Sequence, residues 1–176
     1  MKRTRNWIVA AFVLVLLGGA VYQHGAAKRN AVPVDGAPKP GFAAPSLQLQ
    51  SLDGSREWAI GGQRDKPLLL NYWASWCLPC QEELPDLQSL YEQYGDQLDI
   101  YGVNATFHDE PELAQKKVQQ FGLKFPILTD PDAVGLDLYK VAALPMTFLI
   151  DKNGKIVEVL NLVNREELEK RIKKLI

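Results

Sequence analysis

Along most of its length the chain alternates between short apolar runs and segments with helical spacing. Residues 68–74 form a nearly continuous apolar run, which is typical of a strand buried on both faces of a sheet. A helix is predicted over 78–94, because its apolar residues recur at intervals of three or four and Gly95 ends the pattern. A second buried strand is predicted over 98–104.

The remaining segments predict further strands and helices. Two short strands are predicted on either side of a turn at Asp53-Gly54, and a hairpin is predicted across Asn153-Gly154. The last helix is expected to begin at Asn164, with Glu167 completing a capping-box-like pair. Strands that alternate with helices before a final hairpin indicate an α/β layer fold with a central mixed sheet flanked by helices. The other predicted elements are helices over 110–121 and 132–139 and strands over 126–128, 146–150 and 156–160.

The first 45 residues have a different character. Residues 1–6 are rich in basic side chains, whereas 7–24 carry no formal charge and are mostly apolar. This stretch approaches the length that spans a bilayer, so we predict one transmembrane helix, a signal-anchor, over 7–24. The basic residues ahead of it predict a cytoplasmic n-region and an extracytoplasmic position for everything that follows. Residues 25–45 predict a proline-rich extended linker, which leaves a folded domain over 46–176.

A signal peptide that is removed after export is the alternative to an anchor. Gly25-Ala26-Ala27 offers small residues at a suitable cleavage position. Both interpretations place the folded domain outside the cytoplasmic membrane. The uncleaved anchor, which we prefer, makes the chain a single-pass protein of the cell membrane.

Composition narrows the functional class. The chain has 176 residues, of which 47% are hydrophobic and 23% charged, as expected for one globular domain. Its 20 basic and 21 acidic residues give a net charge of −1, and residues 37–176 hold 15 basic against 20 acidic residues. This balance disfavours nucleic acid as a partner. Two cysteines are too few for a disulfide-stapled scaffold.

Cys77 and Cys80 carry the clearest chemical signal. They stand where the strand over 68–74 gives way to the helix over 78–94, so their thiols lie at a helix N-terminus. That end offers unpaired N–H groups and a partial positive charge, which lower a thiol pKa. We expect Cys77 to be the exposed nucleophile that attacks a substrate disulfide, and Cys80 to be the more buried thiol that resolves the mixed disulfide. Pro79 suits the first helical turn, where its missing N–H is no loss.

A cysteine pair with this spacing can also belong to a zinc site, a c-type haem site or a structural disulfide. A zinc site would need further ligands, but there is no second cysteine pair, and His24 and His108 lack suitable spacing. A c-type haem site needs a histidine where this chain has Gln81. A purely structural disulfide would close a loop too small to stabilise the fold much. A redox pair, without metal or cofactor, is the preferred interpretation.

Two segments resemble the signatures of the thioredoxin superfamily. Residues 71–80 (NYWASWCLPC) are similar to its active-site segment, and residues 144–150 (LPMTFLI) to the loop that enters a strand through a cis-proline. The long interval between them, with an inserted βα segment around 105–130, is similar to the membrane-anchored TlpA/ResA-like branch. The predicted anchor and the N-terminal strand pair fit that branch too. The resemblance covers about residues 40–176 and implies a thioredoxin-like domain.

The resemblance also implies roles for individual residues. Pro145 would be cis and would lie against a redox-active disulfide between Cys77 and Cys80. The backbone of Leu144 would then be free to pair with an extended substrate segment. Trp76 would form the exposed rim of the site.

The chain departs from these relatives at positions that handle protons. Asn71 stands where thioredoxin has a buried aspartate, and Leu78 where ResA-like proteins have a glutamate between the cysteines. Those proteins also place a glutamate just after the strand matching 98–104. Asp109 and Glu110 of this chain lie nearby, but neither one aligns with that glutamate. The sequence therefore assigns no proton acceptor to Cys80.

The resemblance implies an extracytoplasmic thiol-disulfide oxidoreductase that reduces disulfides in exported proteins such as apocytochrome c. Such relatives receive electrons from a transmembrane thiol carrier, so the expected partners are that carrier, exported disulfide substrates and the membrane. A disulfide oxidase or isomerase of the same fold is the main alternative. A thiol peroxidase is disfavoured, since Ala74 stands where those enzymes carry a threonine. A copper chaperone would have only His108 as a histidine ligand.

Overall fold

The computed structural model describes residues 38–176, which form a central five-stranded sheet in the order β5-β4-β3-β6-β7 and a separate pair, β1 and β2. β3 lies at the centre, parallel to β4 and antiparallel to β6, so the sheet is mixed as predicted. The strands are Leu47–Gln50 (β1), Glu57–Ile60 (β2), Leu68–Trp73 (β3), Asp99–Asn104 (β4), Ile127–Thr129 (β5), Met146–Ile150 (β6) and Ile156–Leu160 (β7).

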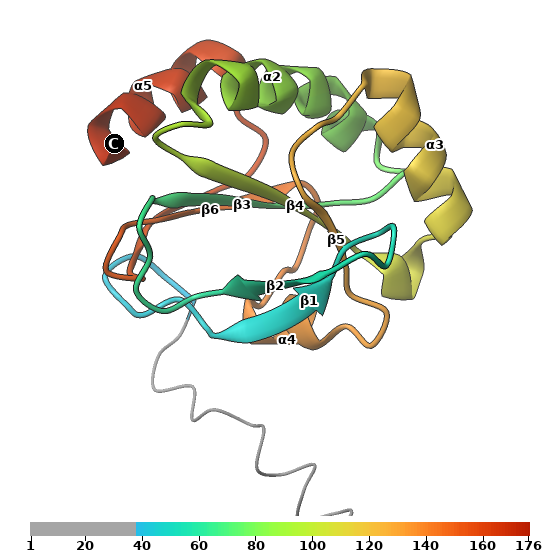
Figure 1. The fold of residues 1–176 in the computed structure, drawn as a ribbon, viewed down its shortest axis with the longest axis horizontal. Helices are drawn as coiled ribbons and strands as arrows, with labels where there is room; N and C mark the ends of the chain where they lie inside the picture. The colour runs from blue at the N-terminus through green and yellow to red at the C-terminus, as the bar shows by residue number, and fades with distance from the viewer. Residues whose placement is uncertain (1–37) are drawn as a thin grey trace, which may run out of the picture. The chain divides into compact units, whose positions relative to one another are not determined.

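The helices lie on both faces of the sheet (Figure 1). α2 (Leu78–Tyr94) and α5 (Arg165–Leu175) cover one face, with α3 (Pro111–Phe121) on the same side. The short α4 (Val134–Leu138) and the β1–β2 pair lie on the other face. The predicted insertion between β4 and α4 is present as a 3-10 turn, η1 (Thr106–His108), followed by α3 and β5.

Side chains alternate along β3 and divide the core into two layers. Leu69 and Trp73 belong to the cluster that packs against α2 and α5, whereas Leu68 and Leu70 belong to the cluster on the opposite face. All four are fully buried, which confirms the prediction of a strand covered on both sides. Because strand residues two apart share a face, Asn71 points to the α2 side together with Leu69 and Trp73. The fold thus places a polar amide beneath the helix that carries both cysteines.

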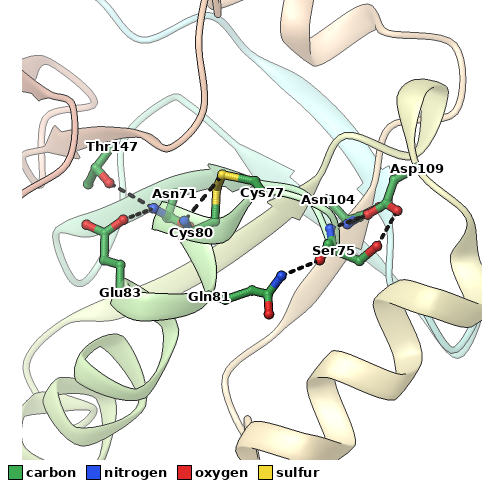
Figure 2. The surroundings of a disulfide bond; sticks show 9 residues. All are labelled: Asn71, Ser75, Cys77, Cys80, Gln81, Glu83, Asn104, Asp109 and Thr147. Atoms are coloured by element: carbon green, nitrogen blue, oxygen red, sulfur yellow. Dashed lines mark hydrogen bonds between the residues drawn. A yellow bond between two sulfur atoms is a disulfide. The ribbon is translucent and has the colours of Figure 1, made fainter.

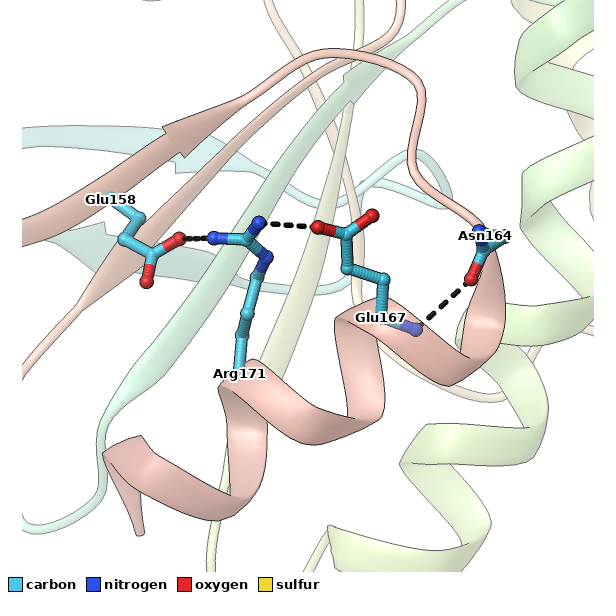
Figure 3. A network of polar contacts seen from close by, with 4 residues as sticks. All are labelled: Glu158, Asn164, Glu167 and Arg171. Atoms are coloured by element: carbon cyan, nitrogen blue, oxygen red, sulfur yellow. Dashed lines mark hydrogen bonds and ion pairs between the residues drawn. The ribbon is translucent and has the colours of Figure 1, made fainter.

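The last helix begins at Asn164 as predicted, but the expected capping box forms only in part. The Asn164 side chain accepts a hydrogen bond from the backbone N–H of Glu167 over 3.0 Å. The Glu167 carboxylate does not return to Asn164 and instead accepts from Arg171, which also reaches Glu158 of β7 (Figure 3). The guanidinium group competes for the carboxylate because Glu167 and Arg171 lie one turn apart on the helix.

Residues 41–43, ahead of β1, pair with the edge of the sheet. Gly41 donates a backbone hydrogen bond to Ile156 over 2.8 Å, and Ile156 donates to Phe42 over 2.9 Å. Ala43 forms an isolated antiparallel bridge with Lys155. These residues fall within the predicted linker over 25–45, so the folded region begins before residue 46. Free backbone groups along the edge of β7 explain the pairing despite the proline-rich composition.

The predicted signal-anchor over 7–24 and cytoplasmic segment over 1–6 lie outside the described residues, and both stay predictions. Among residues 38–176, no helix has the length and apolar character needed to cross a bilayer.

Candidate functional site

The two cysteines are joined in a disulfide at the start of α2 (Figure 2). Cys77 is the N-cap residue of the helix, and its sulfur accepts a hydrogen bond from the backbone N–H of Cys80 over 3.3 Å. The Cys77 side chain therefore faces the positive end of the helix dipole, which favours a thiolate once the disulfide is reduced. Proline at the beginning of the helix leaves its hydrogen bonding intact, as predicted for Pro79.

The burial of the two sulfur-bearing residues partly corrects the sequence-based expectation. Cys80 is the more buried, at 1% exposure, but Cys77 is also buried, at 5%. The neighbouring side chains project instead, because Trp76 is 60% exposed and Leu78 is 66% exposed. Trp76 thus forms an exposed rim as predicted. The residues on either side of Cys77 in the sequence are therefore far more exposed than the cysteine itself.

The proline loop meets the active-site segment at the same end of the sheet. The Leu144–Pro145 peptide bond is cis, as the resemblance implied. Met146, the next residue, pairs with Tyr72 in β3, so the loop lies beside the segment that leads to Cys77. Among the described residues, no hydrogen bond satisfies the backbone of residues 142–144. That stretch is half-buried or exposed and can pair with an extended polypeptide.

A buried polar group that the sequence analysis missed lies beneath the disulfide. Asn71 donates from its amide to Thr147 over 3.0 Å and to the carboxylate of Glu83 over 3.4 Å (Figure 2). Glu83 is only 3% exposed, and its second carboxylate oxygen has no partner among the described residues. Burial raises the pKa of Glu83 from 4.5 to about 7, with a further increase from Asp86 and an opposing effect of the Asn71 hydrogen bond.

The position of Glu83 could have been read from the sequence. It follows Cys80 by three residues, and residues three apart share one face of a helix. Cys80, Glu83, Leu84 and Leu87 are all buried on α2, so the glutamate occupies the inward apolar stripe. A glutamate in the apolar stripe of a helix, one turn after a redox cysteine, is the sequence pattern that indicates a buried acid at the site.

A second carboxylate joins the insertion to the active-site loop. Asp109 accepts hydrogen bonds from the backbone N–H and the hydroxyl of Ser75, each over 2.6 Å, and from the Asn104 amide over 2.8 Å. On the same side, the Trp76 indole N–H donates to the carbonyl of His108 over 2.8 Å. Gln81 of α2 donates to the Ser75 carbonyl over 2.7 Å and closes this network. The residues just ahead of Cys77 are therefore held by the segment that follows β4.

The alternatives to a redox pair find no additional support in this geometry. His108 is exposed at the rim, and its backbone carbonyl accepts the hydrogen bond from Trp76. Within residues 38–176 the structure brings no three His, Cys, Asp or Glu side chains into an arrangement that could hold a metal ion. A disulfide at a helix N-terminus, above a buried acid and beside an unpaired backbone stretch, is suited to thiol–disulfide exchange.

Comparisons with known proteins agree with this geometry. A profile of the AhpC/TSA family matches residues 40–159. The chain is 35% identical over 179 residues to the thiol-disulfide oxidoreductase ResA of Geobacillus thermodenitrificans, an alignment that covers 98% of this chain and 97% of that protein. It is 29% identical over 176 residues to the thioredoxin-like protein YneN of Bacillus subtilis, with 96% and 97% of the two chains covered.

Solved structures show the same fold. The thioredoxin domain of a thiol-disulfide oxidoreductase from Bacteroides vulgatus matches with a TM-score of 0.67 and 25% identity, over 77% of this chain and 96% of that chain. The exposed lipoprotein thioredoxin Etrx1 of Streptococcus pneumoniae matches with a TM-score of 0.62 and 28% identity, over 74% and 100%. The chain therefore belongs to the AhpC/TSA family and is a thioredoxin-like thiol-disulfide oxidoreductase of the ResA type.

Proposed function

We propose that this protein is anchored in the cell membrane and reduces disulfides of exported proteins, such as apocytochrome c, on the extracytoplasmic side. The observation that carries the proposal is the Cys77–Cys80 disulfide at the N-terminus of α2, beside the unpaired backbone that precedes Pro145. The predicted anchor over 7–24 supports the location. The similarity to ResA proteins over nearly the whole chain supports the activity.

The reaction transfers two electrons from the reduced pair to the substrate. The Cys77 thiolate attacks one sulfur of the substrate disulfide, forms a mixed disulfide and releases the other substrate sulfur as a thiolate that takes up a proton. Cys80 then loses its proton and attacks the Cys77 sulfur, which re-forms the Cys77–Cys80 disulfide and releases the second substrate thiol. The protein is oxidised and the substrate is reduced to a dithiol. A transmembrane thiol carrier is proposed to return the electrons.

Glu83 is suited to receive the proton of Cys80. The thiol of a buried cysteine ionises reluctantly, so its attack needs a nearby base. Glu83 lies one helical turn from Cys80, and its pKa of about 7 lets the carboxylate accept a proton near neutral pH. The Asn71 amide, which also donates to Thr147, holds the carboxylate in this position. This assignment supplies the proton acceptor that the sequence alone left open.

Substrate binding is proposed to use the backbone around Leu144. An extended segment that pairs with residues 142–144 would place its disulfide next to Cys77, between the exposed side chains of Trp76 and Leu78. Anchoring the enzyme would raise its local concentration at a membrane-embedded electron donor without any new contact. The proposed roles of the membrane and of the carrier rest on the sequence and the resemblance.

The reduction potential of the Cys77–Cys80 couple tests the direction of transfer. The full chain in a non-ionic detergent is equilibrated against dithiothreitol or glutathione buffers, and the disulfide fraction is measured by thiol labelling. A potential near or below about −250 mV supports a reductase. A potential above about −180 mV makes the protein an oxidase or isomerase instead. Peroxide turnover that survives Cys80→Ala would indicate a peroxidase, and tight copper binding by the reduced protein would indicate a chaperone.

A further inference from the structure

A hollow of about 520 Å³ opens beside the active-site disulfide. One wall is Trp76 from the loop ahead of the cysteines, and another is Phe107 of η1. Leu136 of α4 and the residues 141–144 that lead to the proline close the other side. The hollow is therefore lined in part by the backbone stretch that is proposed to bind substrate.

Exposed aromatic side chains line part of this hollow. Phe107 is 56% exposed and stacks edge-on against His108, with ring centroids 4.6 Å apart. Trp76, also mostly exposed, is held next to them by its hydrogen bond to the His108 carbonyl. Large apolar side chains that gather in the open around a site mark a surface that binds another molecule. A bulky apolar residue of a partner would fit against such side chains.

Two acidic side chains line the hollow. Asp132 and Asp137 line it, both are exposed, and neither carboxylate takes part in an ion pair or hydrogen bond among the described residues. No lysine or arginine lines the hollow. Lys140 is close in the sequence and exposed, but it does not line the hollow. The hollow is therefore lined by two negative charges that no lysine or arginine in its lining offsets.

We propose that this hollow selects disulfide substrates in which a lysine or arginine and a bulky apolar residue stand next to the reactive cysteine. The inference rests on the proposed function and deepens it by naming the substrate class. A cationic side chain would meet Asp132 and Asp137 while the apolar residue contacts Phe107 and Trp76. Charge complementarity of this kind raises the rate of encounter and suppresses acidic competitors.

The test compares three synthetic peptides, each with the same intramolecular disulfide. The residues next to one cysteine are Lys-Leu, Glu-Leu or Lys-Gly. The reduced full chain, in a non-ionic detergent at low ionic strength, is mixed with each peptide, and reduction is followed by chromatography of acid-quenched samples. Each rate is divided by the rate of the same peptide with dithiothreitol, which removes differences in intrinsic reactivity.

A matched pair of variants separates the hollow from the overall charge. D132N/D137N removes the two charges in the hollow, and D65N/D96N removes two exposed charges ahead of β3 and β4, at the opposite end of these strands from the disulfide. We expect the unmodified protein to prefer the Lys-Leu peptide over the Glu-Leu peptide about tenfold. D65N/D96N should keep this ratio, and D132N/D137N should bring it close to one. Phe107→Ala should lower the preference for Lys-Leu over Lys-Gly about threefold.

Three results would overturn the inference. Equal rates for the Lys-Leu and Glu-Leu peptides would show that the hollow does not select by charge. An equal loss of preference in both double variants would assign the effect to net charge. An unchanged preference in D132N/D137N would place the selecting group elsewhere. Reduction of hydroxyethyl disulfide distinguishes a failure of this inference from a failure of the proposed function. A protein that reduces neither this compound nor any of the peptides is not a reductase, and the inference about its substrates is then wrong as well.

Discussion

The Asp109 carboxylate accepts both hydrogen bonds that Ser75 donates, one from the backbone N–H and one from the hydroxyl, each over 2.6 Å. Ser75 is nearly fully buried and stands two residues before Cys77. Asp109 stands between η1 and α3, and one of its oxygens also accepts from the backbone N–H of Glu110. A single carboxylate thus ties the start of the insertion to the loop that presents the reactive cysteine.

Replacing Asp109 with alanine should lower the free energy of unfolding by about 2 kcal/mol, because the buried donors of Ser75 and the Asn104 amide lose their acceptor. Urea unfolding of the oxidised protein measures this change. Glu110→Ala is the matched control, since that neighbouring carboxylate is exposed and makes no hydrogen bond among the described residues. Coinciding unfolding curves for the Asp109 and Glu110 variants would contradict the prediction.

Glu83 should make the stability of the oxidised protein depend on pH. Its pKa is about 7 in the folded protein and near 4.5 when unfolded, so between these values the folded state holds a proton that the unfolded chain has released. Stability therefore falls as pH rises from 4.5 to 7, by about 3 kcal/mol in total, and the loss is complete above the folded-state pKa. Urea unfolding across this range should show the fall in the unmodified protein.

Glu83→Gln removes the titrating group and should flatten that profile. Glu82→Gln is the control, because Glu82 is the exposed neighbour on the same helix. Parallel pH profiles for the unmodified protein and the Glu83→Gln variant would show that burial does not raise the pKa of this carboxyl.

The proposed base role of Glu83 predicts a kinetic effect on one step only. In Glu83→Gln the attack of Cys77 on a substrate disulfide should proceed, while resolution of the mixed disulfide by Cys80 should slow by about 10². Rapid-quench mass spectrometry should then show a mixed disulfide that accumulates before product appears. Glu82→Gln should show no such accumulation. Equal slowing of both steps would point to a structural effect of the glutamine.

Single-cysteine variants should differ in how readily they form a mixed disulfide with a substrate. Cys80→Ser should leave Cys77 able to attack and should yield a stable mixed disulfide with a protein substrate, visible as a mass increase that dithiothreitol reverses. Cys77→Ser should yield far less of such an adduct, because Cys80 is almost completely buried. A reversed order of adduct formation would exchange the proposed roles.

The cap of α5 should contribute to stability independently of the site. Asn164→Ala removes the acceptor for the Glu167 N–H and should lower the free energy of unfolding by about 1 kcal/mol. Asn164→Ser keeps a side-chain acceptor and should therefore retain most of the stability that the cap provides. The reduction potential of the cysteine pair should stay unchanged in both variants. A shift in that potential would show that α5 influences the site.

The sequence alone determined the order of elements and the redox pair. The apolar run over 68–74 identified the central strand because a strand covered on both faces has no polar side to display. The helical spacing after Cys77 and Cys80 placed both thiols at a helix N-terminus, since that information is local. The similarity of residues 144–150 to a known loop identified Pro145 in the same way.

Only the tertiary structure decided which polar groups serve the site. Glu83 is one of several glutamates in the sequence, and its raised pKa comes from burial against β3, an effect that the hydrogen bond from Asn71 opposes in part. A local pattern contains neither the burial nor this contact. Asp109 and Ser75 are 34 residues apart along the chain, so their contact depends on the packing of β3 beside β4. Local patterns fix helices and strands through spacing, whereas pKa values and long-range hydrogen bonds arise when separate segments exclude water together.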